Sequence, residues 1–385
     1  MDRQLRLLPV PSGDAIAGLL PRLADGLAGN GPAWLPVPAD DPLETARLRD
    51  ALGPDSPIDP DIALVVATSG TTGTPKGAQL TGAALLAGAH ATHHRLGGPG
   101  SWLLPLAAHH IAGMQVLVRS IVAGTEPVIL DVSAGFDPLL LPAAVDRMSG
   151  AQRRYTSLVP TQLVKALDAP DAVAALREFD AILLGGAATP VPLFDRATAA
   201  GLRLIRTYGM SETCGGCVYD GVPLDGVDLR LDPADGRILL GGAVLAKGYR
   251  NAPGHPAFAE PGWLRTDDAG ILDGGVLTVV GRLDEAITTG GLTVVPQVVE
   301  TAMSRLPEVR ECAVFALPDA KLGQRVVAAV VLSPGSELDL AGLRAGLAAT
   351  LPATAAPRAL FVVDALPLRG PGKVDRRALA ARFRH

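Results

Sequence analysis

Cysteine is scarce in this chain: Cys214, Cys217 and Cys312 are the only three among 385 residues. A disulfide framework is therefore excluded for a chain of this size. No apolar run approaches the length of a membrane span, and the N-terminal sequence lacks the continuous apolar segment and cleavage site of a secretory signal. We expect a cytoplasmic protein with no membrane partner.

Excess charge of one sign is also lacking, because the formal net charge is only -5. This balance gives no electrostatic reason to expect nucleic acid as a partner. Hydrophobic residues make up 48% of the chain and charged residues 19%, which is typical of a soluble globular protein with a sizeable core. The length favours two domains.

Lysine is rare, with only five residues among the 34 basic ones. Three of the five have glycine beside them: Lys76 in "PKG", Lys247 in "AKGY" and Lys373 in "PGK". Glycine allows a backbone to approach a ligand closely, so these lysines are candidates for ligand contacts. An ordinary surface turn is an equally good explanation for any one of them.

The order of apolar segments predicts the fold class. In the first half, short runs rich in valine, isoleucine and leucine alternate with longer alanine-rich stretches, as expected for mainly parallel sheets flanked by helices. Between Gly226 and Gly281 the segments shorten, which predicts a small antiparallel β subdomain. A compact α+β pattern follows. We predict an α/β fold with a large N-terminal domain over residues 1–283 and a small C-terminal domain over residues 284–385.

The stretch "TSGTTGTPKG", Thr68 to Gly77, follows the apolar run "DIALVVA". A strand that runs into such a loop and then into a helix offers backbone N–H groups, hydroxyl donors and a cation to a polyphosphate. The loop is not a P-loop, because Pro75 stands where the second glycine belongs and Gly77 follows Lys76. A polar surface loop is the alternative to a phosphate-binding loop.

With this loop, the sequence resembles the adenylate-forming acyl-CoA synthetases, a family that includes peptide-synthetase adenylation domains and luciferases. The resemblance runs from Asp61 to the end of the chain. Its further motifs follow in the expected order: "LPLAAHHIAG", "LLGGAA", "YGMSET", "RTDDAG", "GRLDEAITTGG" and "PLRGPGKVDRR". Fewer residues precede the loop than in most members, so part of the usual N-terminal subdomain is expected to be reduced.

The resemblance implies a two-step reaction in which a carboxylate attacks the α-phosphate of ATP and the thiol of coenzyme A then displaces AMP. The resemblance thus implies ATP and coenzyme A as cosubstrates and Mg²⁺ as the cofactor. Glu212 would hold Mg²⁺, and Lys373 would place a cation at the α-phosphate, so both are expected to be catalytic. Asp284 matches the hinge about which a mobile C-terminal domain turns.

The resemblance also implies the ATP site. Asp268 is assigned to the ribose from register, and Asp267 stays open, because the family usually has glycine before this aspartate. The residues expected to bind ATP are Thr68, Ser69, Gly70, Thr71, Thr72, Gly73, Thr74, Lys76, Gly185, Gly186, Ala187, Tyr208, Gly209, Ser211, Asp268 and Arg282. Gly290 and Gly291 are expected to line the coenzyme A channel.

The acid is indicated by Arg119, nine residues after His110 on an otherwise apolar predicted helix. An arginine there needs a carboxylate, an ion pair or solvent. Family members that act on o-succinylbenzoate, a dicarboxylic precursor of menaquinone, look similar here, and His110 matches the mouth of the acyl pocket. We expect o-succinylbenzoate as the substrate. The alternatives are another aryl or short-chain acid, and an adenylation domain that loads a carrier protein.

Two further motifs have metal-like spacing. Cys214 and Cys217 form "CGGC", but no second pair exists. His90 and His94 lie one turn apart on a predicted helix, with no acidic residue between them. We expect neither motif to bind a metal. The expected partners are a small carboxylic acid, ATP and coenzyme A, and the sequence leaves open whether the chain forms a homodimer.

Overall fold

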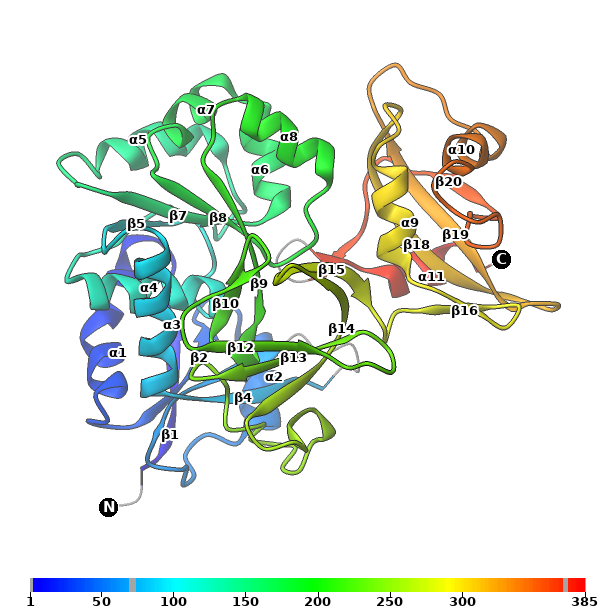
Figure 1. The fold of residues 1–385 in the computed structure, drawn as a ribbon. Coiled ribbons are helices and arrows are strands. Elements are labelled where there is room, and N and C mark those ends of the chain that lie inside the picture. The colour runs from blue at the N-terminus through cyan, green and yellow to red at the C-terminus, as the bar shows by residue number, and fades with distance from the viewer. Residues whose placement is uncertain (1–2, 69–73, 370–372, 385) are drawn as a thin grey trace. The chain divides into compact units, whose positions relative to one another are not determined.

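The computed structural model describes residues 3–68, 74–369 and 373–384. The chain divides into two compact units (Figure 1). The first comprises Met1–Gly186, Ala197–Arg230 and Leu239–Thr266; the second comprises Ala187–Arg196, Leu231–Ile238 and Asp267–His385. The predicted boundary at residues 283 and 284 falls inside the second unit and stays a prediction. Within the described residues, no helix combines the length and apolarity needed to cross a membrane.

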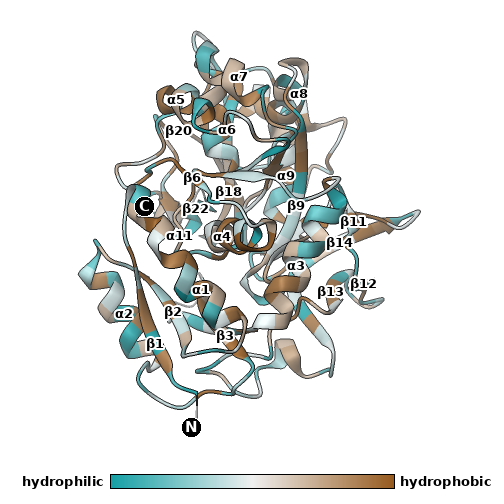
Figure 2. Cartoon of the chain, turned by 90° about the vertical axis from the view of Figure 1, so that its left-hand side faces the viewer, coloured by the Kyte–Doolittle hydropathy of each residue, from teal (hydrophilic) through white to brown (hydrophobic). Residues whose placement is uncertain are grey.

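The first sheet has the order β1-β2-β3-β4. Its strands are β1 (Leu5–Val10), β2 (Ala33–Pro38), β3 (Ile62–Thr68) and β4 (Lys76–Thr81). The connecting helices are η1 (Gly13–Leu19), α1 (Leu20–Leu27) and α2 (Pro42–Leu52). Strands β1 to β3 are parallel and β4 is antiparallel to β3. Figure 2 shows hydrophobic and hydrophilic residues alternating along α1, as expected for a helix that packs one face.

The predicted direct passage from the phosphate loop into a helix is wrong. Lys76 begins strand β4 and pairs with Thr68, so the loop connects two antiparallel strands. Close packing favours a strand here. A Cβ at Gly77 would lie within 2.8 Å of the side chains of both Val65 and Leu52, so β4 packs closely against β3 and α2. Helix α3 begins only at Gly82, where the Thr81 hydroxyl accepts from the backbone N–H of Ala84 at 3.0 Å.

The second sheet confirms the prediction of mainly parallel strands. Its order is β11-β10-β9-β8-β7-β5-β6; the neighbours from β9 through β8, β7 and β5 to β6 are parallel, whereas β10 is antiparallel to both β9 and β11. The strands are β5 (Ser101–Leu104), β6 (Val128–Ile129), β7 (Arg154–Leu158), β8 (Ala181–Leu184), β9 (Leu204–Met210), β10 (Gly215–Tyr219) and β11 (Val222–Pro223). The helices of this part are α3 (Gly82–Arg95), α4 (Ile111–Ala123), η2 (Pro138–Leu140), α5 (Leu141–Asp146), α6 (Pro160–Leu167), α7 (Pro170–Leu176), α8 (Val191–Ala199) and η3 (Ser211–Thr213).

The predicted β subdomain and the C-terminal α+β pattern are both present. A third sheet has the order β12-β13-β14-β15, formed by β12 (Val227–Leu231), β13 (Arg237–Gly242), β14 (Trp263–Asp273) and β15 (Val276–Arg282), with η4 (Pro256–Phe258) between β13 and β14. A fourth sheet contains β16 (Ile287–Thr289), β17 (Leu292–Val294), β18 (Val309–Asp319), β19 (Gly323–Leu332) and β20 (Leu360–Val362). The last elements are α9 (Pro296–Met303), α10 (Leu340–Leu347), the pair β21 (Leu368–Arg369) and β22 (Lys373–Val374), and α11 (Arg376–Arg382).

The long β18–β19 hairpin has a core on each of its two faces. Val314 and Val326 pack with α9 and α10, whereas Phe315 and Val327 pack with Leu379 of α11. Adjacent residues of a strand point to opposite faces, so the nearly continuous apolar sequence of these strands requires cover on both sides.

Candidate active site

The phosphate loop is described only at its ends, because Ser69, Gly70, Thr71, Thr72 and Gly73 lie outside the described residues. Thr68 ends β3, and its buried hydroxyl has no hydrogen-bond partner among the described residues. Thr74 is exposed and Lys76 is half-buried at the start of β4. The structure therefore brings both ends of the predicted loop to neighbouring strands.

Strand β4 also positions a segment that is distant in the sequence. The N–H of Lys247 donates to the carbonyl of Gln79 at 2.9 Å, and the N–H of Arg250 donates to that of Gly77 at 2.8 Å. This pairing places Tyr249 beside Lys76, whose ammonium lies 4.6 Å from the centre of the Tyr249 ring. The same ammonium lies 3.2 Å from Nε2 of His255.

Tyr249 connects Lys76 to Glu212. Its hydroxyl donates to Oε1 of Glu212 at 2.5 Å, and Glu212 is 8% exposed. A buried carboxylate is a hard oxygen donor of the kind Mg²⁺ prefers, and phosphate oxygens and water would complete the coordination. The structure thus joins two residues that the sequence motifs predicted separately, and it adds Tyr249 and His255, which the motifs did not indicate.

The glycine-flanked lysines differ in their surroundings. The ammonium of Lys247 lies 2.9 Å from carboxylate oxygens of both Asp59 and Asp61, and all three side chains are exposed. This is a surface ion pair, so the alternative explanation holds for Lys247. Lys373 is exposed on β22, where it pairs with Arg369, and it belongs to the second unit.

The glycines of "LLGGAA" and "YGMSET" satisfy close backbone packing. A Cβ at Gly185 would lie 2.2 Å from Oγ1 of Thr207, and one at Gly209 would lie 2.0 Å from the carbonyl of Gly215. Gly186 has φ +82°, a conformation that favours glycine. Packing therefore accounts for these glycines within the protein, and their predicted contact with ATP stays a prediction.

The other motif residues follow around these glycines. Tyr208 is half-buried in β9, Ser211 begins η3, and His110 is the N-cap residue of α4. Ala187 is half-buried and belongs to the second unit. Ribose, adenine and acyl contacts of these residues stay predictions.

Arg119 lies in α4 and is 4% exposed. Its Nη2 donates to the hydroxyl of Tyr219 at 3.3 Å, and its Cζ lies 4.9 Å from the centre of the Trp102 ring. Among the described residues no carboxylate forms an ion pair with Arg119, and its Nε has no hydrogen-bond partner. Burial lowers the pKa of the guanidinium from its ordinary value. A buried arginine without a carboxylate is suited to bind an anionic ligand.

Gln115 lies one turn before Arg119 and belongs to none of the predicted site residues. It is 1% exposed, and neither Oε1 nor Nε2 has a hydrogen-bond partner among the described residues. A buried polar group without a partner costs about 1–3 kcal/mol. The amino-acid sequence offers one signal, a glutamine within the apolar stretch "IAGMQVLV".

In the described part of the chain, no group of three or more histidine, cysteine or acidic side chains is arranged to hold a metal ion. Burial raises the pKa of Cys217 to about 12 and also raises that of Cys214, so both thiols stay protonated. The exposed His94 pairs through Nδ1 with Asp225 at 2.5 Å.

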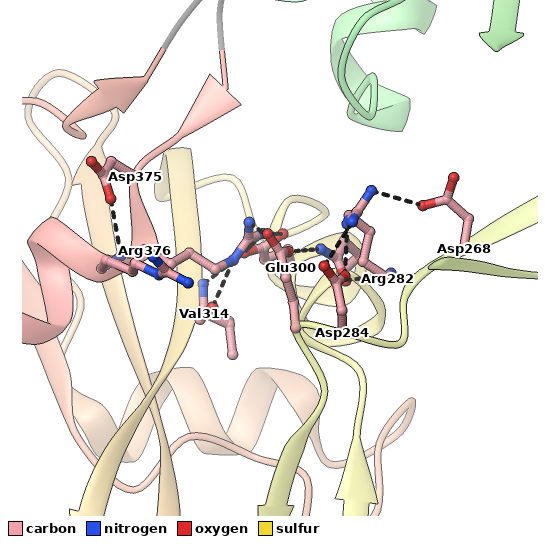
Figure 3. Close-up of polar contacts among 10 residues, drawn as sticks. Asp268, Arg282, Asp284, Glu300, Val314, Asp375 and Arg376 are labelled. Atoms are coloured by element: carbon pink, nitrogen blue, oxygen red, sulfur yellow. Dashed lines mark hydrogen bonds and ion pairs between the residues drawn. The ribbon is translucent and has the colours of Figure 1, made fainter. Parts of the chain in front are cut away.

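In the second unit, Asp268 and Arg282 are paired residues of the β14–β15 hairpin, with 3.6 Å between Nη1 of Arg282 and Oδ1 of Asp268 (Figure 3). Arg282 also binds both carboxylate oxygens of Asp284 at 2.8 and 2.7 Å. Burial opposes the charge of Arg282, but its hydrogen bonds to Asp284 and the nearby aspartates raise its pKa overall. Asp267 is exposed and binds Arg237 at 3.0 Å, whereas Asp268 is buried.

A second polar cluster fixes the segment that carries Lys373. Arg376 donates through Nε to the carbonyl of Val314 at 3.0 Å and through Nη2 to both carboxylate oxygens of Glu300 at 2.8 and 2.9 Å (Figure 3). Its Nη1 lies 2.9 Å from Glu285. Burial raises the pKa of Glu300 despite this arginine. Arg376 therefore anchors α11 to β18 and α9.

Gln297 contacts residues on both sides of the predicted hinge in the sequence. Its Oε1 accepts from the backbone N–H of Arg282 at 3.2 Å, and its Nε2 donates to Oε2 of Glu285 at 2.6 Å. Gly290 and Gly291 form the turn between β16 and β17, with φ of +57° and +81°. Their role in a coenzyme A channel stays a prediction.

The chain matches known families over most of its length. Residues 28–249 match the family described as AMP-binding enzyme, and residues 298–373 match the AMP-binding enzyme C-terminal domain. A probable 2-succinylbenzoate–CoA ligase of Mycobacterium tuberculosis is 60% identical over 383 residues, which are 98% of each chain. A 2-succinylbenzoate–CoA ligase of Salmonella typhimurium is 34% identical over 274 residues, covering 68% of this chain and 56% of that protein.

Solved structures show the same fold. The o-succinylbenzoate CoA synthetase of Bacillus subtilis, in complex with its acyl-adenylate intermediate, has a TM-score of 0.76 and 24% identity, covering 98% of this chain and 88% of that one. The same enzyme with ATP and magnesium ion has a TM-score of 0.80 and 23% identity, covering 98% and 89%. These likenesses confirm the predicted α/β architecture.

Proposed function

The chain belongs to the AMP-binding enzyme family, and we propose that it is an acid–thiol ligase that converts 2-succinylbenzoate to its coenzyme A thioester in menaquinone biosynthesis. In the first step a carboxylate oxygen of the acid bonds to the α-phosphorus of ATP while the bond to pyrophosphate breaks. In the second, the sulfur of coenzyme A bonds to the acyl carbon and AMP leaves. Only positioning and charge stabilisation are required of the protein.

The side chains have separate tasks in this proposal. Lys76 would bind phosphate oxygens, Glu212, oriented by its hydrogen bond from Tyr249, would hold Mg²⁺, and Asp268 with Arg282 would bind the ribose. Mg²⁺, when bound, would neutralise charge on the phosphate oxygens. Lys373 acts in the first step only, and its domain then turns about Asp284 so that coenzyme A can enter. The three free cysteines agree with a reducing cytoplasmic location.

The single observation that carries the choice of acid is Arg119, a buried guanidinium with no carboxylate partner among the described residues. It supports a substrate with a second carboxylate, which 2-succinylbenzoate has. The test is ATP–pyrophosphate exchange with 2-succinylbenzoate, benzoate and short-chain acids, followed by thioester formation with coenzyme A. The expected result is a strong preference for 2-succinylbenzoate. Preference for a monocarboxylic acid, or transfer only to a carrier protein, would contradict the proposal.

A further inference from the structure

Helix α4 carries two buried polar side chains one turn apart. Gln115 and Arg119 are 1% and 4% exposed, and the intervening residues 116–118 are fully buried and apolar. Residues four apart lie on the same face of a helix, so the two side chains share one face of α4. A glutamine in such surroundings needs partners for both ends of its amide.

A comparison within the chain shows that the amide of Gln115 is unusual. Gln162 is also buried, but its Oε1 accepts from the N–H of Val159 at 3.0 Å and its Nε2 donates to the carbonyl of Pro105 at 2.7 Å. Gln162 therefore serves the fold. Neither amide atom of Gln115 has a partner among the described residues, and the same is true of Nε of Arg119.

The neighbours of α4 show which way the face is oriented. A Cβ at Gly215, the first residue of β10, would lie 3.4 Å from Cγ of Gln115, and Tyr219, the last residue of β10, contacts Arg119. Gly215 follows Glu212 by three residues. Gln115 therefore lies against the start of β10, which follows Glu212 in the chain, and Arg119 lies against the end of β10.

The residues that border the amide of Gln115 on α3 and β10 include two glycines, which have no side chain to bond to it. A Cβ at Gly88 of α3 would lie 3.6 Å from Nε2 of Gln115, and Gly215 offers no side chain either. Two glycines thus border a buried amide that has no hydrogen-bond partner in the described part of the chain. This arrangement is that of a ligand-binding group whose partner comes with the substrate.

We propose that Gln115 determines specificity for the acid, by donating from its amide to an oxygen that lies between the reacting carboxylate and the carboxylate held by Arg119. In 2-succinylbenzoate this oxygen is that of the ketone, which separates the two carboxylates. The inference rests on the proposed function, because it takes the reacting end of the acid to lie near Glu212. It assigns the substrate class as dicarboxylic acids with an internal carbonyl.

The experiment compares 2-succinylbenzoate with 2-(3-carboxypropyl)benzoate, in which a methylene group replaces the ketone. Gln115→Leu should lower kcat/KM for the keto acid roughly three- to tenfold and leave kcat/KM for the methylene analogue nearly unchanged. Arg119→Leu should lower both. Gln162→Leu is the matched control for a buried glutamine that serves the fold, and it should lower thermal stability without changing the ratio between the two acids.

Stability gives an independent readout. Replacing an unpartnered buried amide by an apolar group should keep or raise the Tm of the ligand-free enzyme, whereas loss of a structural glutamine lowers it. Gln115→Met provides a second variant should the leucine not fit. Equal losses for both acids, or no loss for either, would overturn the role of Gln115 alone. A wild-type enzyme that does not activate 2-succinylbenzoate would overturn the proposed function and this inference together.

Discussion

The hydroxyl of Tyr249 donates a 2.5 Å hydrogen bond to Oε1 of Glu212, and the ring of the same tyrosine lies beside the ammonium of Lys76. One aromatic side chain thereby sets the positions of a carboxylate and a cation that come from different motifs. Hydrogen bonds that orient a metal ligand affect metal affinity as strongly as many direct contacts do.

Tyr249→Phe should therefore weaken the use of Mg²⁺. The ring and its contact with Lys76 remain, but Glu212 loses its orienting donor. We expect the Mg²⁺ concentration for half-maximal ATP–pyrophosphate exchange to rise roughly tenfold, as found when such partners are removed. Tyr155→Phe is the matched control, because the Tyr155 hydroxyl binds the carbonyls of Leu96 and Gly98, which have no place in the proposed site. An unchanged Mg²⁺ requirement in Tyr249→Phe would remove Glu212 from the metal site.

Lys373→Ala should separate the two half-reactions. We expect adenylate formation to fall by roughly 100-fold, since a cation at the developing charge is lost. Conversion of supplied acyl-adenylate to thioester should continue. Lys321→Ala, which changes an exposed lysine of the same unit, should affect neither step. Equal losses in both half-reactions of Lys373→Ala would rule out a role limited to the first step.

Arg119→Leu should act on the acid and spare ATP. A hydrogen bond to a charged group contributes about 1.5–3 kcal/mol, so kcat/KM for 2-succinylbenzoate should fall roughly ten- to a hundredfold. The KM for ATP should change little. Arg230→Leu is the matched control, since Arg230 also lies over a tryptophan ring, at 4.3 Å, but is exposed. Comparable losses for every acid, together with a lower Tm, would indicate a purely structural arginine.

Asp284→Pro should hinder the proposed turning of the C-terminal domain. Proline fixes φ and restricts Leu283 before it. Adenylation should survive while thioester formation falls. Asp284→Ala separates the two effects, because it removes the carboxylate that binds Arg282 but leaves the backbone free. The hinge would have to be placed elsewhere if both variants lost the same half-reaction to the same extent.

His93 should make stability sensitive to acid. Its Nε2 accepts from Nε1 of Trp102 at 3.3 Å, and burial, followed by the charges of Arg119 and His90, lowers its pKa to about 4. The unfolded chain takes up this proton near pH 6.5, so the stabilisation is complete above pH 6.5 and is lost as the pH falls through 4. The Tm should drop by roughly 2–5 °C over this interval.

The control for this pH effect is a second histidine of α3. His93→Gln should flatten the dependence of Tm on pH between 6.5 and 4, and His94→Gln, at an exposed position, should leave it as in the wild type. A steeper fall in Tm for His93→Gln would contradict a neutral His93 in the folded protein.

Much of the fold could be predicted, because the spacing of apolar residues and the composition change along the sequence where one kind of element gives way to another. The strands β18 and β19 are apolar at nearly every position, as strands covered on both faces must be. Strand β4 was not predicted, since "KGAQLT" is short and partly polar. Its structure depends on pairing with β3, which propensity does not reveal.

Site residues could be predicted where they belong to one sequence motif. Contacts between segments that are distant in the sequence could not be predicted. Tyr249 comes to Lys76 through backbone pairing with β4, and nothing in the spacing of these residues indicates it. Gln115 resembles an ordinary polar residue of a helix until β10 and α3 cover it. The burial of a side chain depends on its tertiary neighbours, and a single sequence does not reveal which residues these are.

Arg376 binds Val314, Glu300 and Glu285 with its whole guanidinium group, three residues after Lys373. These contacts join α11, which follows Lys373, to β18 and α9, so these three elements should move as one body in the proposed turning of the C-terminal domain. A fluorescent label on this body should accordingly report the turn as one exponential phase, and Arg376→Ala should split it into several.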